Sequence, residues 1–298
     1  MTPSFRRLLT GIAFTLPWII GLGTFTVYPV IASLYYSFCD YSVLEPAIWI
    51  GGDNYARMVQ DRTFWLSLEN TLIYAGFSLP LSMVVALSLA LLLNCRVRGT
   101  ALFRTIFYLP SIVPVIASSM LWLWIFNPSY GLLNQALAPI CHLFGANPPG
   151  WLGDPSWSKP ALILMSAWGV GNSMIIYLAG LQDVPESLYE AAEIDGANKW
   201  QQFWYVTLPM LMPVIYFNLV MGIIGALQTF TQVFVMTGGT DGTPAQSTLM
   251  YTTYLFGTAF FDLRMGYASA LAWVLFCIIG LLTLLATRAL RERIAQVQ

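Results

Sequence analysis

The chain has 298 residues, of which 57% are hydrophobic and only 9% are charged, and its formal net charge is −1. A soluble domain carries roughly 25% charged residues, which cover its surface, and a nucleic-acid-binding protein needs a basic face. The composition therefore excludes an ordinary soluble enzyme, a disordered chain and a nucleic-acid-binding protein. The remaining class is an integral membrane protein with several spans in contact with lipid.

Six segments are long and apolar enough to cross a membrane, which takes about 20 mainly apolar residues. The predicted spans cover about 11–37, 70–93, 105–126, 160–181, 206–236 and 267–287. They are helices, because runs of this length do not fit the ~10-residue alternation of a membrane β-barrel. The first is too long for a cleaved signal peptide, so we expect it to stay as an anchor. The predicted fold class is an all-α polytopic membrane protein, with residues 1–298 forming one transmembrane domain.

Arginine and lysine residues set the orientation of these spans. Six spans place both termini on one side, and cytoplasmic loops carry an excess of Arg and Lys. Nine of the 13 Lys and Arg residues fall at the termini and in loops 94–104 and 182–205, against four in loops 38–69, 127–159 and 237–266. We therefore expect both termini to be cytoplasmic.

The predicted outer loops hold few candidates for chemistry. Segment 53–66 predicts a short amphipathic helix on the outer surface, and the Gly, Thr and Pro residues of 237–249 end the fifth span. The four cysteines lack a CxxC spacing, which argues against a zinc site; Cys39 and Cys141 either pair or, as we favour, stay free. For His142, the only histidine, a surface or packing role is favoured over catalysis. No metal or cofactor is expected in this chain.

The interiors of the predicted spans lack ionisable residues, which are the usual mark of proton relays and ion pathways. Uncharged polar groups are present instead. Gln228 and Gln232 are four residues apart and are expected on one face of the fifth span. With Phe230 and Trp168, these amides would suit a neutral polyhydroxyl solute. Lining of a pathway and packing between helices explain the amides equally well at this stage.

The predicted cytoplasmic loop 182–205 is the most informative stretch. Asp183 and Glu186 have the spacing of a capping box, which predicts a helix over 185–195 that stops at Gly196. A second helix, over about 197–205, leads into the fifth span.

Two prolines, Pro209 and Pro213, fall just inside the fifth span and predict a bend there. The acidic residues of the loop point to a basic or dipolar partner. The alternative is a capped connector that only returns the chain to the membrane.

The same loop carries a motif of defined spacing. It reads Glu190-Ala191-Ala192, three residues, Gly196, nine residues, Val206, one residue, and Leu208-Pro209. In this pattern the chain resembles the permease subunits of bacterial ABC importers, with Val206 in place of the commoner isoleucine. Further stretches resemble the carbohydrate branch of that family, the maltose- and glycerol-phosphate-type permeases, over nearly the whole chain. They are Tyr28-Pro29 with Ser33 and Ser37-Phe38, Asp53-Asn54-Tyr55, Tyr108-Leu109-Pro110, Gly131 with Asn134, Trp151 with Asp154-Pro155, and Thr237-Gly238-Gly239.

The resemblance implies a type I importer fold in a bacterial or archaeal plasma (inner) membrane, and a division of labour between chains. The implied partners are a second, homologous permease subunit, two ATP-binding cassette subunits that hold ATP and Mg²⁺, and an extracytoplasmic sugar-binding protein. Closure of the ATPases would rock the permease pair between inward- and outward-facing states. The implied coupling residues are Glu186, Ser187, Tyr189, Glu190, Ala191, Ala192, Asp195, Gly196 and Ala197.

The resemblance also implies a solute pathway built from three spans. Its positions in this sequence are Ser111, Val115, Ser166, Gly169, Val170, Ser173, Met221, Gly225, Gln228 and Phe230. We add Gln232, from the face that it is expected to share with Gln228.

The chain is not expected to hydrolyse ATP. A phosphate-binding loop needs Gly-Lys-[Ser/Thr], but Lys159 is followed by Pro160 and Lys199 by Trp200, and neither lysine follows a glycine. A membrane enzyme would need clustered acid–base groups, and a secondary transporter or channel would need ionisable groups in the spans, so both are disfavoured. Because the spans supply no positive charge, a neutral mono- or oligosaccharide is favoured over glycerol-phosphate or another polar solute.

Overall fold

The structure is a computed structural model that describes residues 3–95 and 99–295. It divides into two compact units, Met1–Asp61 with Leu255–Phe276, and Arg62–Tyr254 with Cys277–Gln298. The expectation of one transmembrane domain stays a prediction.

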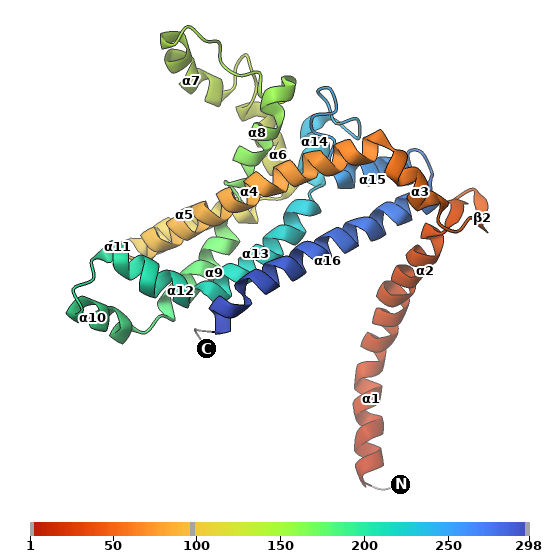
Figure 1. Cartoon of the computed structure of the whole chain (residues 1–298), viewed down its shortest axis with the longest axis horizontal. Coiled ribbons are helices and arrows are strands. Elements are labelled where there is room, and N and C mark those ends of the chain that lie inside the picture. The colour runs from red at the N-terminus through yellow and green to blue at the C-terminus, as the bar shows by residue number, and fades with distance from the viewer. Residues whose placement is uncertain (1–2, 96–98, 296–298) are drawn as a thin grey trace. The chain divides into compact units, whose positions relative to one another are not determined.

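The first unit begins with one helical stretch that prolines and glycines do not interrupt. α1 (Pro3–Leu22), a π-helical turn (Gly23–Val27) and α2 (Tyr28–Ser37) follow one another directly (Figure 1). A proline lacks an N–H and collides with the carbonyl four residues before it. The wider π turn just before Pro29 relieves both problems. The predicted first span is therefore helical throughout its length.

A β-hairpin, which was not predicted from the sequence, follows α2. β1 (Cys39–Ser42) pairs antiparallel with β2 (Glu45–Trp49). Asn54, in α3 (Asp53–Gln60), holds the hairpin to α2, because its Nδ2 atom donates to the carbonyls of Ser37 and Cys39, both at 2.9 Å. A Cβ on Gly266 would clash with the Cys39 carbonyl oxygen, so only glycine fits where α16 (Met265–Ala295) meets β1.

The predicted surface helix 53–66 is wrong at its end. α3 ends at Gln60 and the backbone of Asp61 is extended. Residues 62–66 begin α4 (Arg62–Asn94) instead. Phe64 is buried there and packs edge-on against Tyr251, so this stretch belongs to a core and not to a surface helix.

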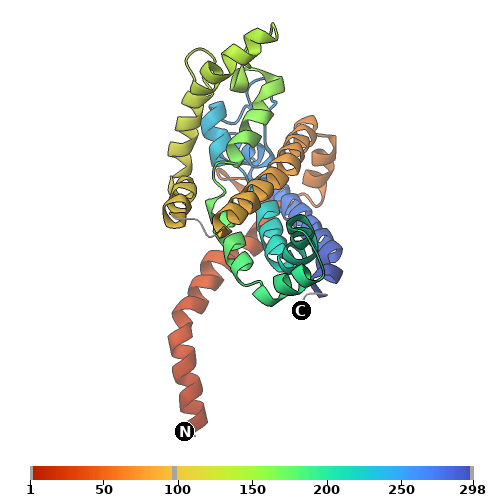
Figure 2. The same cartoon turned by 90° about the vertical axis from the view of Figure 1, so that its left-hand side faces the viewer.

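The second unit is built around α4. α9 (Gly171–Gln182) and α13 (Met212–Leu227) pack along it (Figure 1). Ala86 and Ala90 of α4 are fully buried in this contact, where small residues let helices approach closely. The last part of α16 lies beside α13 (Figure 2), and the Tyr216 and Thr287 hydroxyls are 2.9 Å apart.

Three of the predicted spans are bent pairs of helices. Residues 105–126 form α5 (Thr100–Ile112) and α6 (Val115–Ile125), bent by 98°, and residues 160–181 form α8 (Pro155–Ser166) and α9, bent by 46°. The predicted bend at the start of the fifth span is confirmed, because Lys199–Met210 and Met212–Leu227 meet at 65°. At the sharpest bend, Pro114 disfavours a helical conformation of Val113, whose backbone is extended.

The fifth span also ends earlier than predicted. α13 stops at Leu227, and a separate short helix, α14 (Thr231–Thr237), follows. Within the described residues, Thr10–Ser37, Arg62–Asn94 and Met265–Leu290 can each cross a membrane alone, and the three bent pairs bring the total to as many as six spans. Six spans therefore agree with the sequence analysis.

The connecting segments are more ordered than the sequence predicted. Loop 127–159 contains α7 (Leu132–Leu143) and a 3₁₀ turn (Trp151–Gly153), and loop 237–266 contains α15 (Tyr251–Phe260). Trp151 is buried, and its indole N–H donates to Asn134 at 2.7 Å. All four cysteines are free, as favoured above.

Candidate functional site

A pocket of about 440 Å³ lies within the second unit, where α4, the α5–α6 bend, the end of α8 and α13 meet. Its lining residues are Tyr74, Ser78, Leu79, Ser82, Pro110, Ser111, Val113, Val115, Ser118, Met165, Ser166, Trp168, Gly169, Gly222, Gly225, Ala226, Thr229 and Gln232. None of these residues is acidic, basic or a histidine. The pocket is thus polar but carries no formal charge.

One face of α4 forms a polar wall of this pocket. Tyr74, Ser78 and Ser82 follow one another at four-residue intervals, so they project from the same side of the helix. Ser82 donates to both the carbonyl and the hydroxyl of Ser166, each at 3.3 Å. These three α4 residues are not among the predicted pathway residues, although a polar group at every fourth residue of an apolar span is a signal for such a wall.

The opposite wall comes from the α5–α6 bend, which brings residues of both helices to one place. Gly171 makes room for it, because a Cβ there would lie 2.8 Å from the Ser111 hydroxyl and 3.0 Å from the Tyr108 Cα atom. The start of α9 therefore abuts α5 directly.

Three serine hydroxyls of the pocket can accept hydrogen bonds from a ligand. Ser111, Ser118 and Ser166 each donate to the backbone carbonyl three residues earlier, at 2.7, 2.9 and 2.6 Å. A hydroxyl has one proton and two lone pairs. Because the protons are engaged within the helices, the lone pairs remain for a ligand.

Gln232 adds a further acceptor. Its Nε2 atom donates to the Tyr74 hydroxyl at 2.7 Å and to the Thr229 hydroxyl at 3.0 Å. Both amide protons are therefore used, and the carbonyl oxygen of the side chain is left to bind a ligand. Trp168 also lines the pocket and contributes an aromatic side chain to it.

The structure gathers some of the predicted pathway residues and separates others. The pocket is lined by Ser111, Val115, Ser166, Gly169, Gly225 and Gln232. The residues outside its lining are Val170, Ser173, Met221, Gln228 and Phe230. Val170 is buried in the α4–α9 core, and Met221 is 54% exposed.

The face that Gln228 and Gln232 were expected to share does not exist. The helix ends at Leu227, Phe230 has non-helical backbone angles, and Gln232 belongs to α14. Gln228 is exposed, whereas Gln232 lines the pocket. A four-residue spacing places side chains together only where the helix is continuous.

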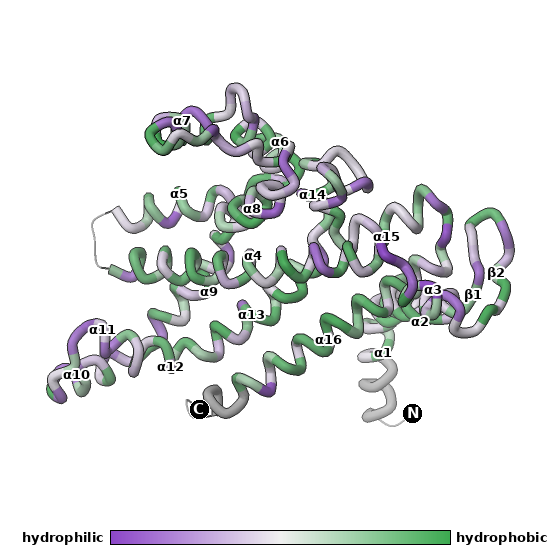
Figure 3. Tube along the Cα trace, turned by 45° about the horizontal axis from the view of Figure 1, so that its top comes forward, coloured by the Kyte–Doolittle hydropathy of each residue, from purple (hydrophilic) through white to green (hydrophobic). Residues whose placement is uncertain are grey.

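The loop between α9 and α13 forms a second candidate site. Its first helix, α10 (Glu186–Ile194), has no buried residue. Figure 3 shows hydrophilic residues along α10 and α11 (Lys199–Gln202), in contrast to the largely hydrophobic α4. The predicted stop at Gly196 is confirmed, since this residue has φ +79° and the Gly196 and Ala197 N–H groups close the helix on the carbonyls of Glu193 and Ala192.

The predicted capping box at the start of α10 is wrong. The residue at that position is Pro185, with no hydrogen bond from a side chain to the cap, because Asp183 still belongs to the end of α9. The capping box stands one helix later, where Asn198 and Gln201 exchange hydrogen bonds of 2.9 and 2.8 Å at the start of α11. α11 then passes into a π turn (Phe203–Thr207), which precedes Pro209 as the first π turn precedes Pro29.

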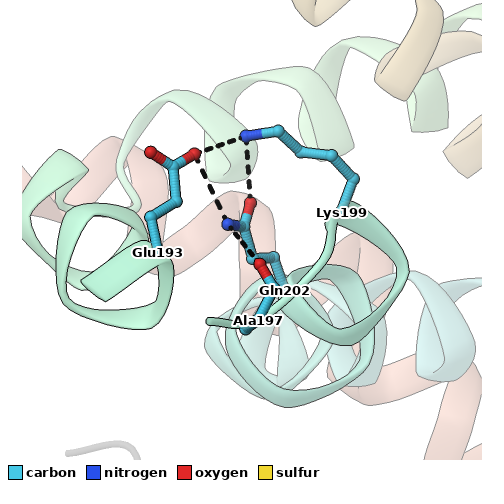
Figure 4. Close-up of polar contacts among 4 residues, drawn as sticks. All are labelled: Glu193, Ala197, Lys199 and Gln202. Carbon is cyan, nitrogen blue, oxygen red and sulfur yellow. Dashed lines mark hydrogen bonds and ion pairs between the residues drawn. The ribbon is translucent and has the colours of Figure 1, made fainter. Parts of the chain in front are cut away.

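Two contacts hold α10 against the start of the following span. The Tyr189 and Thr207 hydroxyls are 2.9 Å apart. One turn later, the Lys199 ammonium lies 2.6 Å from the Glu193 carboxylate and donates to Gln202 at 3.2 Å (Figure 4). The hydrogen bonds from Lys199 and Gln202 and the charge of Lys199 lower the pKa of Glu193, against a small opposing effect of burial.

Because Tyr189 and Glu193 are four residues apart, one face of α10 is fixed to the span. The predicted coupling residues differ in their exposure. Tyr189, Ala192 and Ala197 are half-buried. The exposed ones are Glu186, Ser187, Glu190, Ala191, Asp195 and Gly196. Ile194, which is not among the predicted coupling residues, is 87% exposed and adds an apolar side chain to the exposed surface of the loop.

Comparison with known proteins identifies the family of this chain. Residues 70–296 match the family described as binding-protein-dependent transport system inner membrane component. The probable ABC transporter permease protein YesP of Bacillus subtilis is 44% identical over 93% of this chain and 89% of its own length. The lactose transport system permease protein LacF of Rhizobium radiobacter is 37% identical over 96% and 95%. A chain of a bacterial ABC transporter that imports the acidic polysaccharide alginate superposes with a TM-score of 0.83, at 26% identity and 97% coverage of both chains.

Proposed function

This chain belongs to the family of binding-protein-dependent transport system inner membrane components, and on that premise we propose that it carries a neutral mono- or oligosaccharide across the membrane. It is a multi-pass permease subunit of an ABC importer. The observation that supports the proposed cargo is the pocket of about 440 Å³, whose lining offers hydroxyl and amide acceptors, an indole and no charge.

The chemistry of the pocket matches a sugar. A saccharide presents many hydroxyl donors, and the lone pairs of Ser111, Ser118 and Ser166 and the carbonyl oxygen of Gln232 can accept them. The faces of sugar rings carry C–H groups, which pack on an aromatic surface such as Trp168. Relatives with similar sequences are named for lactose and for trehalose/maltose.

An anionic saccharide is the second candidate, because the alginate importer resembles this chain closely in structure. An anion without a counter-charge is costly to hold in a site of low dielectric constant. Since the pocket has no Lys, Arg or His, the neutral sugar is the better match.

The loop around α10 is the proposed contact with the ATPase. Its exposed residues include Glu190 and Asp195 beside the apolar Ile194, and they stand on a helix that is fixed to the next span. Movement of a partner bound to this surface would therefore pass through α12 (Leu208–Met210) into α13, which lines the pocket. The proposed assembly contains a second permease subunit, two ATPase subunits and an extracytoplasmic sugar-binding protein, with both termini cytoplasmic.

The ATP and Mg²⁺ are proposed to bind to the ATPase partner. Neither Lys159 nor Lys199 stands in a Gly-Lys-[Ser/Thr] sequence.

The test is uptake by the complete transporter, with its binding protein, in lipid vesicles. Labelled neutral mono- and oligosaccharides are compared with a uronic-acid oligosaccharide and with glycerol-phosphate. We expect uptake of a neutral sugar, and we expect Trp168→Ala to lower that uptake about tenfold because a stacking surface is lost. Trp157→Ala is the matched control, since Trp157 lies outside the pocket lining. Preferred uptake of an anion, or equal loss in both variants, would contradict the proposal.

A further inference from the structure

Lys159 stands apart from the pocket and from the coupling loop, and its charge has no carboxylate partner within the described residues. It is half-buried near the start of α8, and its Nζ atom donates to the Asn70 Oδ1 atom at 2.8 Å. An ammonium group has three donors, so this bond leaves two for another ligand. A partly buried charge calls for a counter-charge, and Asn70 is neutral.

Asn70 holds this ammonium in a defined place. Its side chain is only 1% exposed. Its Nδ2 atom donates to the carbonyls of Gln246 and Leu249, at 2.9 and 3.1 Å, so its Oδ1 atom must point the other way, to Lys159. The lysine is thus oriented by a buried amide and is not a mobile surface side chain.

An apolar groove of about 490 Å³ begins at Lys159 and runs between α4 and α8. Its other lining residues are Ile73, Phe77, Leu81, Pro160, Ile163 and Leu164. Ile73, Phe77 and Leu81 are spaced by four residues and form a different face of α4 from Tyr74, Ser78 and Ser82. The groove is therefore separate from the proposed sugar pocket, and the ring of Phe77 is 65% exposed in it.

The position of the groove along the helices follows from their ends. The α8–α9 pair runs from Pro155 to Gln182 and leads into α10. At that far end, Asn94 of α4 shares a small pocket with Gln182 and Tyr189. Lys159 accordingly lies at the end of the span opposite the coupling loop, where a lipid headgroup would be found.

We propose that this groove binds an anionic phospholipid in the leaflet remote from α10. The phosphate pairs with the Lys159 ammonium, and one acyl chain lies along Phe77 and Ile163. Charge complementarity favours this occupant, because a zwitterionic lipid already carries its own cation and a free phosphate gains nothing from an apolar groove. The bound lipid joins α4 to α8 and, through Asn70, to the segment that holds Gln246 and Leu249.

The test is native mass spectrometry of the intact transporter, mixed with phosphatidylglycerol or with phosphatidylcholine of the same acyl chains. We expect wild type to retain phosphatidylglycerol over phosphatidylcholine by about fivefold, the factor that one lysine beside an anionic headgroup supplies. Lys159→Met should remove the preference and Lys159→Arg should keep it. Arg57→Gln is the control, because it deletes one exposed positive charge outside the groove.

Two further measurements keep the proposal open to refutation if Lys159→Met fails to assemble. Ile163→Trp fills the groove while Lys159 stays, so it should lower retention of phosphatidylglycerol. A photo-reactive amino acid at position 77 should form an adduct with a lipid. Equal retention of the two lipids by wild type, unchanged retention in Lys159→Met or Ile163→Trp, or an adduct of Phe77 with a protein subunit would overturn the proposal. These readouts do not depend on which sugar is transported.

Discussion

The pocket and the coupling loop of this permease are built from opposite kinds of residue. The pocket has hydroxyls, an amide and an indole but no charge, and its polar groups are engaged with helices on several sides. The coupling loop has acids and a lysine on exposed helices, held by a few contacts along one face. Under the proposed function, this difference separates two tasks within one subunit. A neutral solute has to leave the pocket again, whereas the ATPase partner has to stay bound to the loop.

The environment of each region explains its chemistry. In the bundle, a charge would be costly to bury, and the pocket accordingly offers hydrogen-bonding groups without a formal charge. At the loop, water screens the charges, so an ion pair such as Glu193–Lys199 contributes little stability but fixes an orientation.

The largest effect is expected from Gly196→Val. The residue has φ +79°, where a side chain costs about 1–2 kcal/mol and a β-branched one is least tolerated. The end of α10 should shift and uptake should fall more than tenfold, while the ATPase subunits keep hydrolysing ATP. Gly196→Asn is the matched control, because asparagine tolerates this conformation. Both rates are measured in vesicles, and full uptake by the valine variant would show that the shape of this turn does not matter for coupling.

A medium effect is expected from a pair of glutamines that the sequence cannot tell apart. Gln232→Ala removes an acceptor from the pocket and its bonds to Tyr74 and Thr229, and should raise the sugar concentration for half-maximal uptake about fivefold. Gln228→Ala, four residues earlier but exposed, should change it less than twofold. If the sugar concentration for half-maximal uptake rises equally in the two variants, Gln228 also contacts the sugar. The break after Leu227 would then not separate the roles of Gln228 and Gln232.

The smallest effect is expected from lowering the pH, which weakens the contact between Glu193 and Lys199. The pKa of Glu193 is lowered below its ordinary value of 4.5 in the folded loop. Its contact with Lys199 therefore stabilises the loop above that value and is lost as the pH falls through the lowered pKa. Spin labels at Ala191 and Gln201 should show a narrow distance distribution at neutral pH that broadens below about pH 4.5. Glu193→Gln should be broad at every pH; a pH-dependent width in that variant would assign the change to another carboxyl group.

The helical segments were predicted well and their interruptions poorly. Hydropathy found the six spans, and the Gly196 stop and the bend at Pro209 and Pro213 followed from local backbone chemistry. The 98° bend before Val115 was missed, although Pro114 marks it. Hydropathy is averaged over a whole span, so it does not detect a helix break of only two residues. The β-hairpin was missed as well, because its strands are short and lack alternation.

By itself, the sequence determined that this protein crosses the membrane several times, that its predicted spans hold no ionisable interior residue, and that one loop carries residues at the spacing of an importer-family motif. These properties depend on composition and on neighbours close along the chain. Only the tertiary structure decided that Tyr74, Ser111, Ser166 and Gln232 meet in one pocket while Gln228 does not. It also decided that Asn70 turns Lys159 toward an apolar groove. Contacts of this kind depend on where helices bend and cross. Those bends and crossings are determined jointly by residues that are far apart in the chain.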